Sequence, residues 1–479
     1  MNTRKRFSFL LALLTACIAG PFALAQAQQA TPSTDNTSTA PDEAAALQYR
    51  LENEGDVLAV VQAREDGQLD VLHGQITDVL ITGASAKVEK EIRRLLAPLL
   101  DLQVPLLSDV EYHLSLVTDL HGVSTQFALH RIETPGDYAL EVAVFEQRGS
   151  GLIAMDTVPR AGFDQLRGTF HQEFYSLFEG GDVLRLNAAY TQGEASNEDG
   201  LAFFGSYQTF MGSDGTFLEA AIGNSSAKID SLILGAQDTG YETNSLSLMF
   251  GKDLTRSQTG SKVIYAEGTL IDDKNADQGD SLLSILRGSF FQRIDATDGS
   301  RTSFGLTGSF GIDDNALTNT NETFTSIRAG FGHIVPTPRI LKSSELLIEL
   351  FGQLGQKNSP AAELFYLGSS QFLRGFNRGQ YAGNSGATLS LEFGWLASVA
   401  DQTLRPFLFL DSGYVQNDDN ARTSDSRPES NLIASSGLGV DLYIKDTLAS
   451  LRGWIGAPIY DQEFDKDDPF IYIQFQVGW

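Results

Sequence analysis

The sequence has 479 residues, with 34 Lys and Arg against 61 Asp and Glu, and a formal net charge of −27. A chain this acidic is not expected to bind nucleic acid, because phosphate recognition needs a basic face; with 42% hydrophobic and 20% charged residues it is also too apolar to be disordered. The 46 Gly, 30 Phe and 14 Tyr favour a mainly β protein, and the length allows one large unit plus a small one.

Residues 1–25 have the features of a secretory signal peptide. Three basic residues, Arg4–Arg6, precede the apolar stretch Phe7–Ile18, and Ala23–Ala25 provides small residues for cleavage. Leu14–Cys17 resembles a lipoprotein box, so cleavage at Cys17 is the alternative. Cleavage after Ala25 would leave a mature chain without cysteine, and therefore without disulfides. Beyond the leader no apolar run is long enough for a spanning helix, which leaves a soluble exported protein or an outer-membrane β-barrel.

Two short regions precede the first clear structural pattern. Residues 26–50 have the composition of a linker, and a short helix is expected over Glu43–Glu52, either as a linker helix or as a plug for a pore. Residues 51–73 predict a hairpin, with strands Val57–Ala63 and Gln68–Leu72 around the turn dipeptide Asp66-Gly67.

Residues 74–147 predict a small α/β domain of order β-α-α-β-β. A strand is expected over Gln75–Thr82, and a hairpin over Val123–Ile132 and Tyr138–Glu146. Between them lie two amphipathic helices. The first has apolar residues at helical spacing, namely Val88, Ile92, Leu95, Leu96 and Leu99. The second is expected to start at Ser108 in a capping box with Glu111, to bury Val110, Leu114 and Val117, and to end at His121-Gly122.

From residue 150 to 479 the helical period is replaced by strict alternation, as in Ala387, Leu389, Leu391, Phe393 and Trp395. Sixteen such segments begin near residues 150, 166, 182, 200, 215, 242, 262, 281, 301, 324, 343, 386, 404, 431, 448 and 470. An even number of alternating strands separated by acidic loops is typical of a transmembrane β-barrel. The fold class predicted is therefore mainly β, a 16-stranded transmembrane barrel preceded by a small α/β domain.

Motifs for enzymes are missing from the sequence. It contains no Gly-x-Ser-x-Gly, no phosphate-binding loop and no His-Glu-x-x-His, and its six histidines are scattered. Aspartate pairs such as Asp272-Asp273 could bind Ca²⁺, but solvated loop charge is the preferred interpretation. We therefore expect no enzymatic activity, no cofactor and no metal.

Three stretches resemble a known family. Residues 74–146 start with GQITDVLITG, residues 367–395 read LGSSQFLRGFNRGQYAGNSGATLSLEFGW, and residues 406–415 read PFLFLDSGYV. Together they are similar to the POTRA-plus-barrel superfamily, which includes BamA and TamA. Within it, the chain is most similar to two-partner secretion transporters of the ShlB/FhaC/HecB haemolysin secretion/activation type. That family usually has two POTRA domains, whereas only 74–147 is complete here, and 51–73 is a possible remnant of a first one.

The resemblance implies a site inside the barrel. It identifies Arg374, Gly375 and Phe376 as the motif of a long loop that lies between strands eleven and twelve and folds into the lumen. It also implies that Asp411 pairs with Arg374. In the ordinary alternative, Arg374 is a solvated loop arginine and Asp411 a turn residue at a strand end.

Alternation along the Asp411 strand agrees with this site. If Leu408, Leu410 and Tyr414 face lipid, then Phe407, Phe409, Asp411 and Gly413 face the lumen, where Asp411 could accept bidentate bonds from a guanidinium. Gly375 would let the loop bend, and Phe376 is expected to pack on Phe407 or Phe409. At the chain end, Ile471, Ile473, Phe475, Val477 and Trp479 share one face, and Phe475, Val477 and Trp479 resemble the terminal signal read by the barrel assembly machinery.

The resemblance implies a non-enzymatic translocator in the outer membrane of a Gram-negative bacterium, with its POTRA domain in the periplasm. The implied partners are an unfolded exoprotein client captured in the periplasm, outer-membrane lipid and lipopolysaccharide, and the barrel assembly machinery, with no nucleic acid. Two alternatives stay open: an assembly and insertion factor of the same superfamily, or a passive porin or surface adhesin.

Overall fold

The computed structural model describes residues 40–479 except 65–67, 161–162, 193–198, 230–238, 258, 276–279, 316–319, 358, 369–372, 377–380, 417–429 and 463–468. The predicted signal peptide and the turn at Asp66-Gly67 lie outside the described residues. Among the described helices, none combines the length and the apolar character needed to span a membrane.

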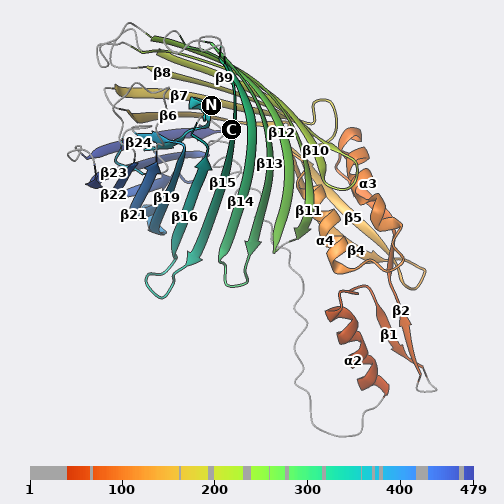
Figure 1. Cartoon of the computed structure of the whole chain (residues 1–479). Coiled ribbons are helices and arrows are strands. Elements are labelled where there is room, and N and C mark those ends of the chain that lie inside the picture. Colours follow the sequence, from red (N-terminus) through yellow and green to blue (C-terminus); the bar gives the residue numbers. More distant parts are fainter. Residues whose placement is uncertain are drawn as a thin grey trace.

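The first described elements are a helix and a hairpin. Helix α2 (Ala40–Asn53) precedes the antiparallel strands β1 (Val60–Ala63) and β2 (Leu69–Leu72). Gln48 joins the helix to the hairpin: its Nε2 donates to the Ala59 carbonyl at 2.9 Å, and its Oε1 accepts from the Val61 N–H at 2.9 Å. Figure 1 shows α2 beside β1 and β2, outside the barrel, so the helix does not plug the pore in this structure.

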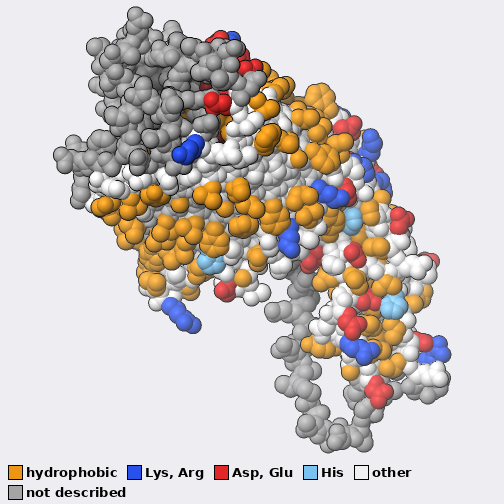
Figure 2. Space-filling view, in the orientation of Figure 1, with side chains coloured by type: hydrophobic (Ala, Val, Ile, Leu, Met, Phe, Trp, Pro, Cys, Tyr) orange, Lys and Arg blue, Asp and Glu red, His pale blue; other side chains and the backbone are white. Residues whose placement is uncertain are grey.

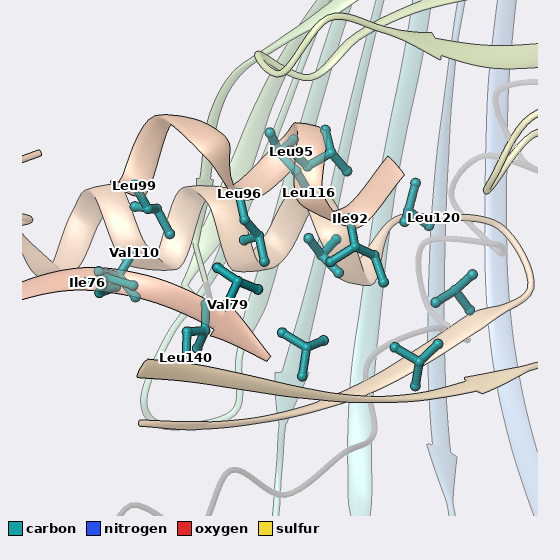
Figure 3. Close-up of a cluster of buried hydrophobic side chains, with 14 of the residues drawn as sticks. Ile76, Val79, Ile92, Leu95, Leu96, Leu99, Val110, Leu116, Leu120 and Leu140 are labelled. Carbon is teal, nitrogen blue, oxygen red and sulfur yellow. The ribbon is translucent and has the colours of Figure 1, made fainter. Parts of the chain in front are cut away.

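The next elements form an α/β module with the predicted β-α-α-β-β order. They are β3 (Gln75–Thr82), α3 (Ala86–Leu100), α4 (Leu107–Thr118), β4 (Val123–Arg131) and β5 (Asp137–Glu146). The sheet order is β3-β5-β4, with β3 parallel and β4 antiparallel to β5. Both helices pack their aliphatic stripes on the sheet, and the side chains of Ile92, Leu96 and Leu140 belong to the core between the layers (Figure 3).

The predicted start of the second helix is wrong. Helix α4 starts at Leu107, and the Leu106 backbone N–H donates to the Asp109 side chain at 3.1 Å, so Asp109 caps it rather than Ser108 or Glu111. Leu114 is only half-buried, whereas Leu116 is fully buried. The helix ends at Thr118, before His121-Gly122. The two other core predictions on this helix are confirmed, because Val110 and Val117 are buried.

The rest of the chain forms a closed barrel. Its strands are β6 (Gly149–Arg160), β7 (Phe163–Tyr175), β8 (Val183–Gln192), β9 (Asp199–Met211), β10 (Thr216–Ile229), β11 (Thr239–Ser257), β12 (Gly260–Asn275), β13 (Ser281–Asp295), β14 (Arg301–Asn315), β15 (Thr320–Pro336), β16 (Ser344–Gly355), β19 (Ser385–Trp395), β20 (Ala397–Val399), β21 (Gln402–Gln416), β22 (Ser430–Tyr443), β23 (Ala449–Asp461) and β24 (Phe470–Gly478). Both β19 and β20 pair with β21, and β24 pairs with β6, so the described strands make sixteen barrel positions, as predicted.

The two faces of the barrel wall differ in character. Along β13, Leu282 and Leu286 are exposed on the outer face, whereas Arg287 and Arg293 are buried on the inner face. Outward-facing apolar side chains form a broad band across the barrel (Figure 2). Apolar residues outside and charged residues inside are the arrangement of a transmembrane barrel.

The α/β module is docked on one end of the barrel, where α4 lies close to β11 (Figure 1). The Tyr112 hydroxyl donates to the carbonyl of Asp214 at 2.8 Å and to that of Asp253 at 3.1 Å. Asp119 forms an ion pair with Arg256 of β11. Because β6 starts beside the module and the strands alternate in direction, the loop after β16 leaves the barrel at the opposite end.

Candidate functional site

The loop between β16 and β19, the eleventh and twelfth barrel strands, contains the predicted site. It includes the short helix η2 (Ala361–Glu363) and the paired strands β17 (Phe365–Leu367) and β18 (Tyr381–Gly383). Its apolar side chains form a buried cluster with two residues of β21 and β22; the cluster consists of Phe365, Leu367, Leu373, Phe376, Tyr381, Val415 and Ile433. The loop therefore folds back against the inner wall of the barrel.

Arg374 in this loop is bound by Asp411 of β21. The Asp411 carboxylate accepts three bonds from Arg374: from the backbone N–H at 3.0 Å, from Nε at 2.9 Å and from Nη2 at 2.9 Å. Ser390 of β19 donates to the same carboxylate at 2.7 Å and accepts from Arg374 Nη2 at 3.2 Å. Asp411 is 0% exposed and Arg374 is 3% exposed. A bidentate, buried, fully hydrogen-bonded pair fixes the loop backbone as well as the side chain.

A second carboxylate, Glu392 of β19, extends this contact into a network that the sequence analysis did not identify. Arg374 Nη1 donates to Glu392 Oε2 at 2.5 Å, and Arg405 Nη1 donates to Glu392 Oε1 at 2.8 Å. Arg452 and Arg405 each also contact Asp441, at 3.3 Å. Glu392 lies between Leu391 and Phe393 in the alternating pattern, so its inward orientation could have been deduced from the sequence.

The aromatic residues of β21 lie beneath the guanidinium groups. The Arg374 guanidinium carbon is 3.8 Å from the Phe409 ring centroid and 6.0 Å from that of Phe407. Cation–π attraction is strengthened when the charge is desolvated, as it is here. Glycines of β22 provide the space, because a Cβ on Gly437 or Gly439 would lie 2.4 or 2.3 Å from the Phe409 or Phe407 ring.

The expected contact of Phe376 with Phe407 or Phe409 is wrong. Phe376 packs in the loop cluster, whereas Phe407 and Phe409 pack with Trp454 and Tyr472. The reason is that the Arg374 guanidinium itself covers the Phe409 ring.

Two glycines allow this close approach. Gly375 has φ +93°, a conformation that side chains disfavour, and its Cβ would lie 3.0 Å from the Gly456 carbonyl carbon of β23. Gly413, next to Asp411 on the inner face, leaves room for Leu373, whose Cδ1 would be 2.2 Å from a Cβ there. The structure thus brings Arg374, Gly375, Asp411 and Gly413 together.

The last strand closes the barrel. Phe475 and Val477 lie on the exposed outer face of β24, and Trp479, which follows the strand, is exposed as well. The backbone N–H groups of Trp479 and Gly151 each donate to the other's carbonyl at 3.1 Å, which ties the chain end to β6. The role of these side chains as an assembly signal stays a prediction. In the described part of the chain, no group of three or more His, Cys, Asp or Glu side chains could hold a metal ion.

A closed sixteen-stranded barrel with an N-terminal α/β module and an anchored lumen loop defines the class by its fold, an outer-membrane-type β-barrel with an additional α/β domain. Residues 269–442, which include Arg374 and Asp411, match the sequence model of the haemolysin secretion/activation protein family ShlB/FhaC/HecB. This match confirms the resemblance predicted from the sequence. The family is described as one of secretion and activation proteins rather than as an enzyme class. No curated protein matches the chain.

Solved structures share this fold. CdiB from Acinetobacter baumannii superposes with TM-score 0.71 at 14% identity, covering 92% of this chain and 81% of that chain. CdiB from Escherichia coli has TM-score 0.74 at 15% identity, covering 91% of this chain and 83% of that chain. BamA from Haemophilus ducreyi, lacking POTRA domains 1–3, has TM-score 0.54 at 15% identity, covering 95% and 94%. At these identities, the likeness concerns the fold.

Proposed function

We propose that this protein is an outer-membrane translocator of the two-partner secretion type, which exports an unfolded exoprotein through its barrel without enzymatic activity or a cofactor. The observation that carries this proposal is the anchoring of Arg374 to Asp411 inside the lumen, within the segment that matches the secretion family. A loop fixed there constrains the path of a client, and its release or displacement would open that path.

In this proposal residues 1–25 are the signal peptide, residues 26–50 a linker, and residues 150–479 the outer-membrane barrel. Residues 74–147 are the POTRA domain, which lies in the periplasm and captures the client. Its strands β3 and β4 are the edges of a three-stranded sheet, and an extended client segment could add to either edge by β-augmentation. Residues 51–73 would be what remains of a first POTRA domain.

Lipid and lipopolysaccharide are the proposed surroundings of the barrel, supported by its apolar outer band (Figure 2). The barrel assembly machinery is the proposed route of insertion. The outward row of Phe475, Val477 and Trp479 on the last strand supports that route.

A comparative secretome tests the function. The gene is deleted, then wild type, Arg374→Ala or Arg167→Ala is expressed at equal outer-membrane levels. Arg167 is the matched control, because it pairs with Asp156 at 2.6 Å within the wall and does not contact the loop. We expect deletion to remove one large secreted protein, which wild type and Arg167→Ala restore and Arg374→Ala restores poorly.

Other outcomes of this experiment favour the alternatives. Loss of many barrel proteins from the outer membrane would indicate an assembly factor, the function to which the BamA-like fold also points. An unchanged secretome with altered solute permeability would indicate a passive porin and contradict the proposal.

A further inference from the structure

The lumen loop has a second charged contact with the wall, eleven residues before Arg374. Glu363 at the end of η2 is 1% exposed. Its Oε1 accepts from Arg287 Nη2 at 2.6 Å, and its Oε2 accepts from Arg328 Nη2 at 2.7 Å. The Glu363 carbonyl accepts from Gln353 Nε2 at 2.7 Å and from Arg328 Nη2 at 3.3 Å. The carboxylate and the backbone of this residue are therefore both held by the wall.

This contact has the opposite polarity and a different place on the wall from the Arg374 contact. Here the loop supplies the acid, and β13 and β15 supply the cations; at Arg374 the loop supplies the cation, and β19 and β21 supply the acids. In the order β13-β14-β15-β16-β19, the two contacts lie on opposite sides of β16, the strand from which the loop emerges.

The buried arginines of the wall need the negative charge of Glu363 as compensation. Arg287 and Arg328 both point inward with side chains 4% and 14% exposed. Arg287 Nη1 also lies 3.9 Å from Glu267, a much longer contact than the one with Glu363. Buried guanidinium groups need compensating charge, because desolvation of an ion is expensive. Withdrawal of Glu363 would therefore leave two neighbouring cations with too little negative charge.

Apolar packing supports the same position. Ala362 packs against a small cluster formed by Leu283, Ile285 and Phe324 of the wall. Phe324 fits there because Gly311 has no side chain; a Cβ on Gly311 would lie 2.2 Å from the ring. The η2 segment thus packs into a complementary apolar site on the wall, and the Glu363 ion pairs lie beside that site.

We propose that Glu363 is a positioning residue that forms a second anchor of the lumen loop, so that the loop is a strap fixed on both sides of β16. Freeing the lumen then requires both anchors to open, and loss of either one leaves the loop partly held. The existence of the anchor is independent of what crosses the barrel, whereas its consequence for export rests on the proposed function.

The test measures access to the loop in the full chain in native outer membranes. Ala362→Cys is introduced in a background in which Cys17, the one cysteine of the sequence, is replaced by Ser, and its reaction rate with a maleimide is measured. We expect Glu363→Gln to increase this rate at least about tenfold, the ratio that corresponds to about 1.4 kcal/mol. Glu363→Asp, which retains the charge, should give a smaller increase. An unchanged rate with Glu363→Gln would overturn the proposal.

Two controls keep the result interpretable. Glu219→Gln removes a wall carboxylate that is 13% exposed and that contacts Arg185 at 3.8 Å and not the loop, so it should change the rate less than about twofold. If Glu363→Gln fails to give a heat-modifiable folded barrel, the triple variant Glu363→Gln, Arg287→Met, Arg328→Met removes the ion pairs without leaving buried cations. It should also label fast; slow labelling would contradict the anchor.

Secretion of the client is measured on the same variants and separates the two proposals. Faster labelling together with changed export supports the anchor and its part in transport. Faster labelling in a strain whose wild-type protein exports no client supports the anchor and contradicts the proposed function. Slow labelling with normal wild-type export contradicts the anchor and leaves the function standing.

Discussion

The α/β module and the barrel lumen are stabilised by opposite kinds of interaction. The module core is aliphatic, with Ile92, Leu95 and Leu96 at 0% exposure. The lumen site is ionic, with Arg374 and Asp411 almost as deeply buried. Burial of a Leu side chain is itself favourable by about 1.5–3 kcal/mol. Burial of a charge is costly unless its partner and hydrogen bonds are in place.

This difference determines what each region can do. An aliphatic core contains no ion pairs or hydrogen bonds that could break, and it tolerates only small changes of packing. An ion-pair network has two well-separated states, because a guanidinium that leaves its carboxylate must be solvated or paired elsewhere. The module is therefore suited to keep a fixed shape, and the lumen loop is suited to be held or released.

The largest effect is expected from Asp411→Ala. This change removes the acceptor of three bonds from Arg374 and leaves a buried guanidinium with Glu392 as its remaining carboxylate. Breaking a buried pair from one side costs about 3–5 kcal/mol. Unfolding in guanidinium, followed by tryptophan fluorescence, should show this loss. Arg374→Met combined with Asp411→Ala should recover part of it; a double variant no better than Asp411→Ala would contradict an ionic anchor.

A slightly smaller effect is expected from Leu96→Ala in the module. Leu96 is fully buried between α3 and the sheet, and truncation of such a residue costs about 2–5 kcal/mol. Hydrogen exchange of the β5 backbone should become faster, while the heat-modifiable mobility of the barrel stays unchanged. Ile92→Val provides the graded comparison at about 0.5–1.5 kcal/mol. Equal loss of protection in β5 and in barrel strands would show that the two regions are not separate in stability.

The junction between the regions should respond to pH through His121. Burial and the neighbouring Arg185 guanidinium lower the pKa of His121 to about 3, and Arg185 Nη2 lies 3.4 Å from its Nε2. The pKa in the unfolded chain is about 6.5, so the unfolded state binds more protons between pH 6.5 and 3, and stability falls as the pH is lowered through this window.

This loss amounts to about 1 kcal/mol for the first unit below pH 6.5. Exchange at the histidine C2 position, read by mass spectrometry, measures the pKa of His121 directly. Local opening of the segment after α4, measured by hydrogen exchange at pH 6.5 and 5.5, should become easier in the wild type and not in His121→Gln. A pKa near 6.5 would show that the junction is open to water.

The sequence predicted what depends on short-range pattern. Barrel strands alternate with period 2, so each predicted start lies within a few residues of the observed one, as at 281 and 301. The start of α4 was misplaced because its N-cap residue, Leu106, has no capping side chain, and Asp109 at the third helical position accepts from the Leu106 N–H instead. The Arg374–Asp411 pair was found through a family motif rather than through any local pattern.

The rest of the lumen site depends on which strands the closed sheet brings together. Glu363 and Arg287 are 76 positions apart in the chain, and no periodicity connects them. The orientation of Glu392 is deducible from alternation, but its partners Arg405 and Arg452 depend on strand order and register. Phe376 was misplaced for the same reason, since a loop residue has no fixed face.

The smallest effect is expected where an ion pair is exposed. Arg64 and Asp70 next to the β1–β2 hairpin are 2.6 Å apart, but their side chains are 55% and 50% exposed. Such pairs contribute about 0–1 kcal/mol, because water and salt screen them and two long side chains must be ordered. Asp70→Asn should therefore change the free energy of unfolding by less than about 1 kcal/mol when unfolding is measured in guanidinium. When unfolding is measured in urea, this change should become smaller as salt is added. A loss comparable to that of Asp411→Ala would mean that burial is not what separates the lumen pair from this one.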